Sequence, residues 1–121
     1  MFRLFSSLFL ILTFSSCGTP LPEFKDLDLE AWRNDKNACN AYRSGKIEEI
    51  KSQKDKFLAL DQAQIIALLG KPERNELYKR NQKFYYYHLT PGPECAGAPE
   101  KNSQLVIRFN ATGLAKEVAI E

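Results

Sequence analysis

The sequence predicts an α+β fold in which two helices pack on one face of a three- to four-stranded antiparallel meander sheet. Two observations predict it. Up to Gly70 the apolar residues recur at helical spacing, whereas beyond Pro72 they alternate with polar residues in runs rich in aromatic and β-branched side chains. Helical segments followed by consecutive strands, with no internal repeat, are typical of a single two-layer domain.

Two helical patterns come first. Residues 28–38 can begin at Asp28 as the amino-terminal cap, and Leu29 and Trp32 mark one face. A second pattern follows Ser44 and Gly45 and covers residues 46–59. Its expected buried stripe consists of Ile47, Ile50, Lys54 as a polar interruption, Phe57 and Leu58.

The clearest helix covers residues 62–69. Asp61 is a good amino-terminal cap, Gly70 stands where a left-handed carboxy-terminal cap is favoured, and Pro72 blocks continuation. We expect its buried face to be Ile65, Leu68 and Leu69. About two turns of helix are marginal alone, so this helix must gain its stability from packing.

The strands follow, separated by turn residues. A tight turn at Asn81 and Gln82 joins the first two, and Asn110 to Gly113 forms a later hairpin connection. The expected strands cover residues 76–80, 83–89, 104–109 and 116–120.

The side chains of the aromatic strand 83–89 alternate between the two faces of the sheet. We assign Tyr85, Tyr87 and Leu89 to the core, because the other set includes the polar imidazole of His88. Phe84, Tyr86 and His88 then face outward, and they are the candidate partner-binding residues. The alternative is that the amino-terminal segment or the loop 90–103 covers them.

Residues 1–16 have the features of a secretory signal peptide: a charged tip with Arg3, an apolar run from Leu4 to Phe14, and two serines at its end. The apolar run is too short to span a bilayer as a helix. The next residue, Cys17, completes a pattern that resembles the lipobox of bacterial lipoproteins. This resemblance implies that Cys17 becomes the lipidated amino terminus, carrying acyl chains such as palmitate. An ordinary signal peptide with a chance cysteine is the alternative.

Removing residues 1–16 from the 121 leaves 105, which is enough for one domain with a modest core. Residues 17–27 contain two prolines and no periodicity, so we expect a flexible tether before a single domain at 28–121. The net charge is +2, or +1 without Arg3, which is too small for a nucleic-acid-binding footprint.

With Cys17 lipidated, Cys39 and Cys95 remain as an even pair in an oxidising compartment, which favours a disulfide. Closing so long a loop contributes roughly 4 kcal/mol in the chain-entropy model. The bond would hold the long loop 90–103, which contains three prolines and two glycines. The alternative is a metal site formed by Cys39, Cys95 and His88, but no fourth ligand is evident.

No arrangement of residues predicts catalysis. His88 is expected at the surface, and no serine or cysteine nucleophile has a base at a recognisable spacing. Around Cys39 we expect an ion pair between Asp35 and Arg43, with Trp32 as a core anchor under the Cys95 loop. No cofactor and no small-molecule substrate is predicted.

The second half resembles the SmpA/OmlA (BamE-like) domain family of envelope lipoproteins. The resemblance covers residues 58–120 and rests on Leu-Leu-Gly-Lys-Pro at 68–72, the aromatic run 84–87, the apolar run 105–109 and Gly113. It implies two helices on a three-stranded antiparallel sheet. The segment from Trp32 to Arg43 and the Cys95 loop depart from this family and are closer in spacing to small lipoproteins of the Bacteroidetes type.

These observations favour a non-catalytic protein held at the outer membrane by its lipid, facing the periplasm. The resemblance implies that it acts as an accessory or scaffold module that binds a protein partner. An inhibitor-type or ligand-binding domain is the alternative, because the fold plan also resembles the repeat unit of β-lactamase inhibitor proteins.

Overall fold

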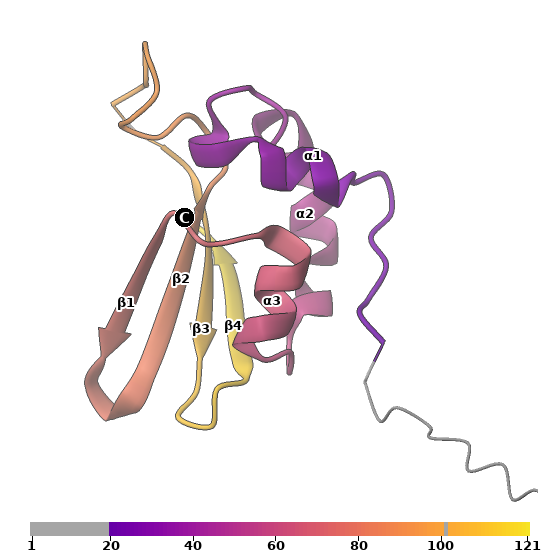
Figure 1. Ribbon diagram of the computed structural model, residues 1–121, viewed down its shortest axis with the longest axis vertical. Coiled ribbons are helices and arrows are strands. Elements are labelled where there is room, and N and C mark those ends of the chain that lie inside the picture. Colours follow the sequence, from indigo (N-terminus) through magenta and orange to yellow (C-terminus); the bar gives the residue numbers. More distant parts are fainter. Residues whose placement is uncertain (1–19, 101) are drawn as a thin grey trace, which may run out of the picture.

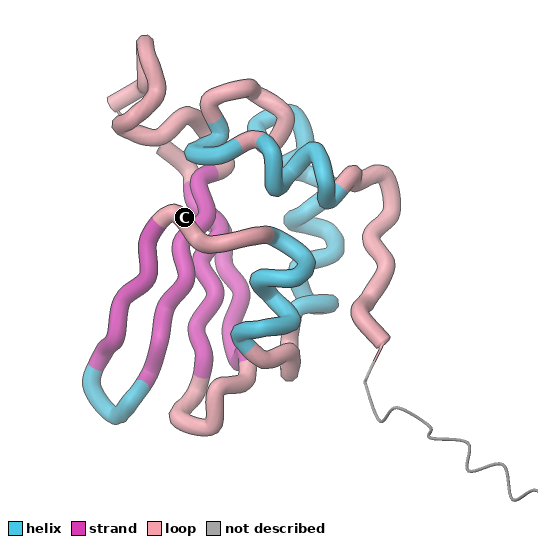
Figure 2. Tube along the Cα trace, viewed as in Figure 1, coloured by secondary structure: helices cyan, strands magenta, loops and turns pink. Residues whose placement is uncertain are grey.

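The computed structural model describes residues 20–100 and 102–121, so Cys17 and the expected signal peptide lie outside the described residues. The predicted fold class is confirmed. One antiparallel sheet has its strands in the order β1-β2-β3-β4, and the helices cover one of its faces (Figures 1 and 2). The strands are β1 (Arg74–Tyr78), β2 (Gln82–His88), β3 (Gln104–Phe109) and β4 (Ala115–Ile120), and the α-helices are α1 (Leu29–Asn34), α2 (Ile47–Gln53) and α3 (Gln62–Leu69).

Helix α1 begins at the predicted cap but ends earlier than predicted. One carboxylate oxygen of Asp28 accepts hydrogen bonds from the backbone N–H groups of Glu30 and Ala31, at 3.0 and 3.2 Å. The chain leaves α-helical geometry at Asp35 and enters a 3₁₀ turn, where Asn37 has a φ of 59°. The predicted helix 28–38 is therefore a helix of six residues followed by this turn.

The second predicted helix is divided in two. Helix α2 continues into a 3₁₀ turn, Lys54–Phe57, and the side chains of Ile50 and Phe57 are fully buried. The prediction for Leu58 is wrong, because the backbone becomes extended there and leaves the side chain 40 % exposed. At the polar interruption, Lys54 Nζ donates to the backbone oxygen of Val118 at 3.2 Å. This lysine therefore joins the helical layer to β4.

Helix α3 has its predicted bounds and its predicted amino-terminal cap, but Gly70 does not form the predicted left-handed cap. Asp61 and Gln64 form a reciprocal capping box, and Ile65, Leu68 and Leu69 are buried. Gly70 has a φ of 79° with an extended ψ of −174°, so it ends the helix outside the left-handed helical region. A side chain would be strained there.

The sheet differs from the prediction mainly at β1, which begins two residues earlier than expected. Its connection to β2 is a 3₁₀ turn, Lys79–Asn81, with positive φ at Arg80 and Asn81. The predicted alternation in the aromatic strand is confirmed, because Tyr85, Tyr87 and Leu89 are all buried against the helices.

The end of the expected tether is packed on the domain rather than free. The ring of Phe24 stacks on Phe57 with the ring centroids 4.9 Å apart, and Leu27 is buried in the core. The side chain of Gln53 accepts from the backbone N–H of Lys25 and donates to its oxygen, at 2.7 and 2.9 Å. Within the described residues, no helix is long and apolar enough to cross a bilayer.

Candidate partner-binding surface

In the described part of the chain, the helices cover one face of the sheet, and we call the other face the outer sheet face (Figure 1). Directly opposed residues in antiparallel strands share a face, so the register assigns its members. The four strands contribute two cross-strand rows. One row is Arg74, Tyr86, Val106 and Ala119, and the other is Glu76, Phe84, Arg108 and Glu117.

Aromatic rings form the centre of the outer sheet face. Phe84 stacks near Tyr86 with centroids 6.3 Å apart, and Tyr78 meets the ring of Phe84 edge-on at 6.0 Å. The guanidinium carbon of Arg74 lies 4.0 Å from the centroid of Tyr86. Phe84 and Tyr86, both predicted as partner-binding residues, are therefore partly exposed members of one aromatic cluster.

Charged pairs surround this cluster. Arg74 lies 3.3 Å from Glu76, and Arg108 lies 3.2 Å from Glu117. Such exposed pairs contribute little stability, typically below about 1 kcal/mol. The hydroxyl of Tyr86 donates to Glu76 at 3.1 Å, and the pKa of Tyr86 is raised by desolvation and then by this carboxylate. An aromatic centre with a polar rim is the usual composition of a protein interface.

The prediction that His88 lies at the surface is wrong. Its side chain belongs to the outer side of β2 by alternation, but the residue is only 8 % exposed. The loop after β2 folds back over the ring, with Asn102 Nδ2 3.3 Å from His88 Nδ1. Gly92 is so close that a Cβ there would lie 2.8 Å from Cδ2 of the ring. His88 therefore presents only a small part of its side chain at the outer sheet face.

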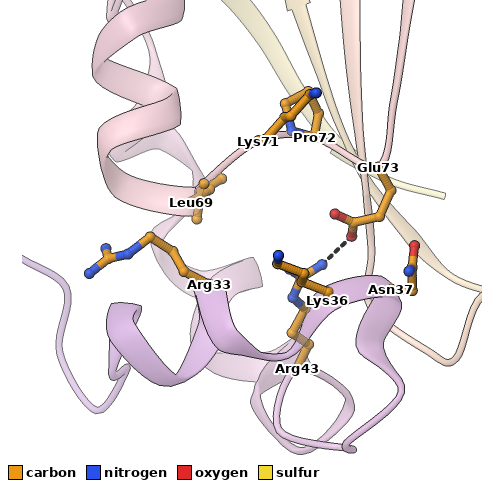
Figure 3. A pocket seen from close by; sticks show the side chains of 9 residues that line it. Arg33, Lys36, Asn37, Arg43, Leu69, Lys71, Pro72 and Glu73 are labelled. Atoms are coloured by element: carbon orange, nitrogen blue, oxygen red, sulfur yellow. Dashed lines mark hydrogen bonds and ion pairs between the residues drawn. The ribbon is translucent and has the colours of Figure 1, made fainter.

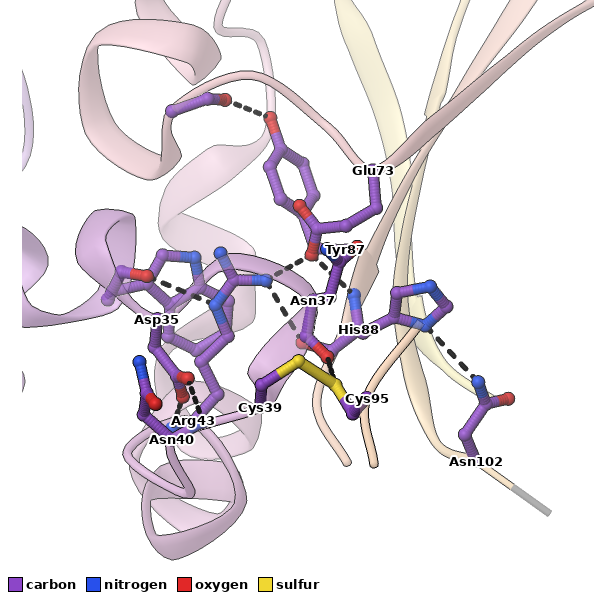
Figure 4. Close-up of polar contacts among 12 residues, drawn as sticks. Asp35, Asn37, Cys39, Asn40, Arg43, Glu73, Tyr87, His88, Cys95 and Asn102 are labelled. Atoms are coloured by element: carbon purple, nitrogen blue, oxygen red, sulfur yellow. Dashed lines mark hydrogen bonds and ion pairs between the residues drawn. A yellow bond between two sulfur atoms is a disulfide. The ribbon is translucent and has the colours of Figure 1, made fainter. Parts of the chain in front are cut away.

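A buried polar cluster lies under that end of the sheet, and Figure 4 shows its contacts. The Arg43 guanidinium forms an ion pair with Glu73 and donates to the backbone oxygens of Trp32 and His88, at 3.1 and 3.2 Å. It also lies 4.9 Å from the centroid of the buried Trp32 ring. Glu73 in turn accepts from the backbone N–H of His88 at 3.0 Å. The cluster joins α1 to the ends of β1 and β2.

The predicted ion pair between Asp35 and Arg43 is wrong. Asp35 is buried, but its carboxylate accepts from the backbone N–H groups of Asn40 and Arg43, at 2.6 and 2.9 Å. Asp35 therefore closes the turn that precedes α2, and the Arg43 guanidinium forms its ion pair with Glu73 instead. Glu73 was not predicted, since a single acidic residue after Pro72 carries no periodic signal that would distinguish it from a surface glutamate.

Cys39 and Cys95 form a disulfide in the structure, 56 residues apart in sequence. The backbone N–H of Gly92 donates to the oxygen of Asn37 at 2.9 Å, which ties the same loop to the turn after α1. Oxidised cysteines cannot be thiolate ligands, so the alternative metal site with His88 is not present. Among the described residues, no other group of three or more metal-ligating side chains comes together.

A shallow hollow of about 240 Å³ lies between α1 and the end of α3, and Figure 3 shows its lining. Arg33 Nη1 donates to the backbone oxygens of Ala67 and Leu68, at 3.3 and 3.1 Å, and so caps the carboxy-terminal end of α3. At the floor, Arg43 is already paired with Glu73. The residues that line the hollow include no nucleophile beside a base.

Comparison with known proteins found a family match for the half of the chain that contains the strands of the sheet. Residues 60–119 match the family described as outer membrane protein assembly factor BamE domain. The matched region includes α3, β1, β2, β3 and nearly all of β4. A search of curated proteins found no match to the chain. The BamE family is one of non-catalytic assembly factors. Through residues 60–119, the chain belongs to the BamE domain family.

Proposed function

We propose that this protein is a lipid-anchored accessory component of an outer-membrane complex, most directly the machinery that assembles outer-membrane proteins. The observation that carries this proposal is the BamE family match over residues 60–119, because the family is an assembly factor of that complex. The domain acts as a scaffold. Its anchor raises its local concentration at the membrane, and a surface of the domain binds a partner.

The anchor is assigned to Cys17. The apolar run and the two serines before this residue support it, and the family consists of periplasm-facing outer-membrane lipoproteins. Several acyl chains on one residue hold a small domain stably, whereas a single chain does not. Replacing Cys17 with serine is expected to move the domain from the membrane fraction to the soluble fraction. Retention in the membrane after a high-salt wash would contradict lipid anchoring.

The partner surface is assigned to the outer sheet face. Phe84 and Tyr86 form its aromatic centre, and the pairs Arg74–Glu76 and Arg108–Glu117 form its rim. Aromatic residues and arginine contribute disproportionately to binding energy at interfaces. Within the described part of the chain, the helices lie on the opposite face of the sheet and do not cover this surface (Figure 2).

A pull-down of the tagged full-length protein from detergent-solubilised membranes tests the proposal. Recovery of a component of the outer-membrane protein assembly complex supports it. Stoichiometric recovery of a soluble periplasmic enzyme would instead support the inhibitor-type alternative. The purified Cys17→Ser protein, added to solubilised membranes that lack the tagged wild-type protein, is the matched control, because it separates partner binding from membrane attachment.

A further inference from the structure

Exposed apolar side chains gather at one end of the domain. The described residues include six exposed large apolar side chains, and five of them belong to segments at the lower end of Figure 1. These segments are the start of the described chain, the connection before α3, the end of β1 and the turn between β3 and β4. We call these five side chains the apolar rim: Leu21, Leu58, Leu77, Tyr78 and Leu114.

The most exposed part of the apolar rim is the end of β1. Leu77 is 67 % and Tyr78 62 % exposed, and two exposed cations, Lys79 and Arg80, follow at the turn. An apolar residue and a tyrosine next to cations suit a membrane interface, where the ring sits at headgroup level and long basic side chains reach the phosphates.

A second part of the apolar rim lies at the same end of the domain, away from β1. Leu58 and Leu114 line a shallow hollow of about 270 Å³, with Lys116 at its side. The opposite end of the molecule is different, because it carries the disulfide-linked loop with exposed Pro93, Glu94 and Glu100. The lower end in Figure 1 thus exposes apolar side chains, whereas the opposite end exposes acidic ones. This difference is expected if only the lower end contacts a lipid surface.

The chain leaves the domain at the same end as the apolar rim. Lys56 Nζ donates to the backbone oxygen of Glu23 at 2.7 Å, and Phe24 stacks on Phe57 at 4.9 Å, so the chain is held from Glu23 onward. Glu23 is six residue steps after Cys17 in the sequence, which is at most about 22 Å of extended chain. A tether this short keeps the exit end of the domain close to the bilayer.

We propose that the apolar rim rests on the bilayer that holds the acyl chains of Cys17, with Leu77, Tyr78 and Leu114 in the headgroup region. This inference depends on the lipid anchor of the proposed function. It gives the domain one orientation, in which the strands stand steeply on the membrane and the outer sheet face is presented sideways to a partner. The disulfide-linked loop is then the part farthest from the bilayer.

The test places a tryptophan at each end of the full-length lipidated protein. Tyr78→Trp reports on the apolar rim, and Pro99→Trp reports on the exposed distal loop. Each variant is reconstituted in phosphatidylethanolamine vesicles with and without phosphatidylcholine that is brominated on the upper part of its acyl chains, next to the headgroups, where it quenches tryptophan at the bilayer interface. The wild-type protein, in which Trp32 is fully buried, supplies the background emission.

We expect the brominated lipid to quench most of the emission added by Tyr78→Trp and little of that added by Pro99→Trp. Equal quenching of both, or none at position 78 in vesicle-bound protein, would overturn the proposed orientation. A blue-shifted but unquenched tryptophan at position 78 would also overturn it, because a second copy or a partner would then cover the rim. Failure of the protein to float with the vesicles would contradict the Cys17 anchor instead.

Discussion

The guanidinium of Arg43 and the carboxylate of Glu73 form a buried ion pair that joins the helical layer to the sheet. Their side chains are 1 % and 8 % exposed. Arg43 belongs to the turns before α2, whereas Glu73 precedes β1, so the pair links segments 30 residues apart. Since the BamE family match begins at residue 60, only one partner of this pair lies in the matched region.

Removing one partner of this ion pair should strongly lower the free energy of unfolding. Arg43→Met leaves the Glu73 carboxylate buried without its cation, and such losses typically cost about 3–5 kcal/mol. The expected result is a large fall in the urea midpoint with an unchanged slope. The double variant Arg43→Met, Glu73→Met should be less destabilised than the sum of the single variants. If the stability lost in the double variant equals the sum of the losses in the two single variants, the two side chains are not coupled.

Loss of the disulfide should destabilise the domain and release the distal loop. Cys39→Ala is expected to lower the free energy of unfolding by up to roughly 4 kcal/mol, because the unfolded chain is no longer cross-linked. Cys95 should then react with a thiol reagent in the folded protein, as measured by mass spectrometry. Reaction of Cys95 in the unreduced wild-type protein would show that the bond does not form.

The contact between Gly92 and His88 should not tolerate a larger residue. In Gly92→Ala the new Cβ would lie within 3.0 Å of two ring atoms of His88, so we expect a loss of about 1–3 kcal/mol in thermal or urea unfolding. Gly45→Ala is the matched control, since nothing lies within 4 Å of a Cβ there. Adding His88→Ser to Gly92→Ala should restore part of the loss. No recovery would contradict a direct steric contact.

Tyr87 should make stability fall in alkaline solution. Burial raises its pKa well above the ordinary 10.0, and its hydroxyl donates to the backbone oxygen of Gly70 at 2.8 Å. As the pH rises, the hydroxyl of Tyr87 therefore ionises in the unfolded chain before it ionises in the folded protein. The contribution of Tyr87 to the free energy of unfolding is complete below pH 10 and declines as the pH rises above it. Tyr87→Phe should lose about 0.5–1.5 kcal/mol at neutral pH.

The alkaline measurement is urea unfolding at several pH values between about 9 and 11. The stability of the Tyr87→Phe protein should decline less steeply than that of the wild-type protein. Tyr85 and Tyr86, whose pKa values are also raised, remain in both proteins and account for a residual decline. Identical slopes for the two proteins would contradict the assignment to Tyr87.

Local signals predicted those parts of the fold that local chemistry determines. The amino-terminal cap at Asp61 and the helix end at Gly70 depend on neighbouring residues alone. The alternation of β2 is equally local, so Tyr85 and Tyr87 were placed correctly in the core. The disulfide between Cys39 and Cys95 could be inferred by counting cysteines, although their contact is distant in sequence.

The errors arose where distant segments meet. Whether Arg43 pairs with Asp35 or Glu73 depends on how the turn before α2 docks on β1, which no periodicity encodes. His88 has the alternation of an outer residue, and only the return of the loop buries it. Phe24 lies in a segment rich in proline, yet it stacks on Phe57 because the helical layer leaves that ring accessible to it.

The most direct test of the scaffold assignment is partner capture by the full-length lipidated protein carrying Phe84→Ala and Tyr86→Ala. Ile66→Ala, which truncates an exposed residue of α3 on the opposite side of the domain, is the matched control. Both proteins should fold and reach the membrane. We expect the double variant to lose the assembly-complex component that the wild-type protein and the control recover. Undiminished recovery by the folded double variant would contradict binding through the outer sheet face.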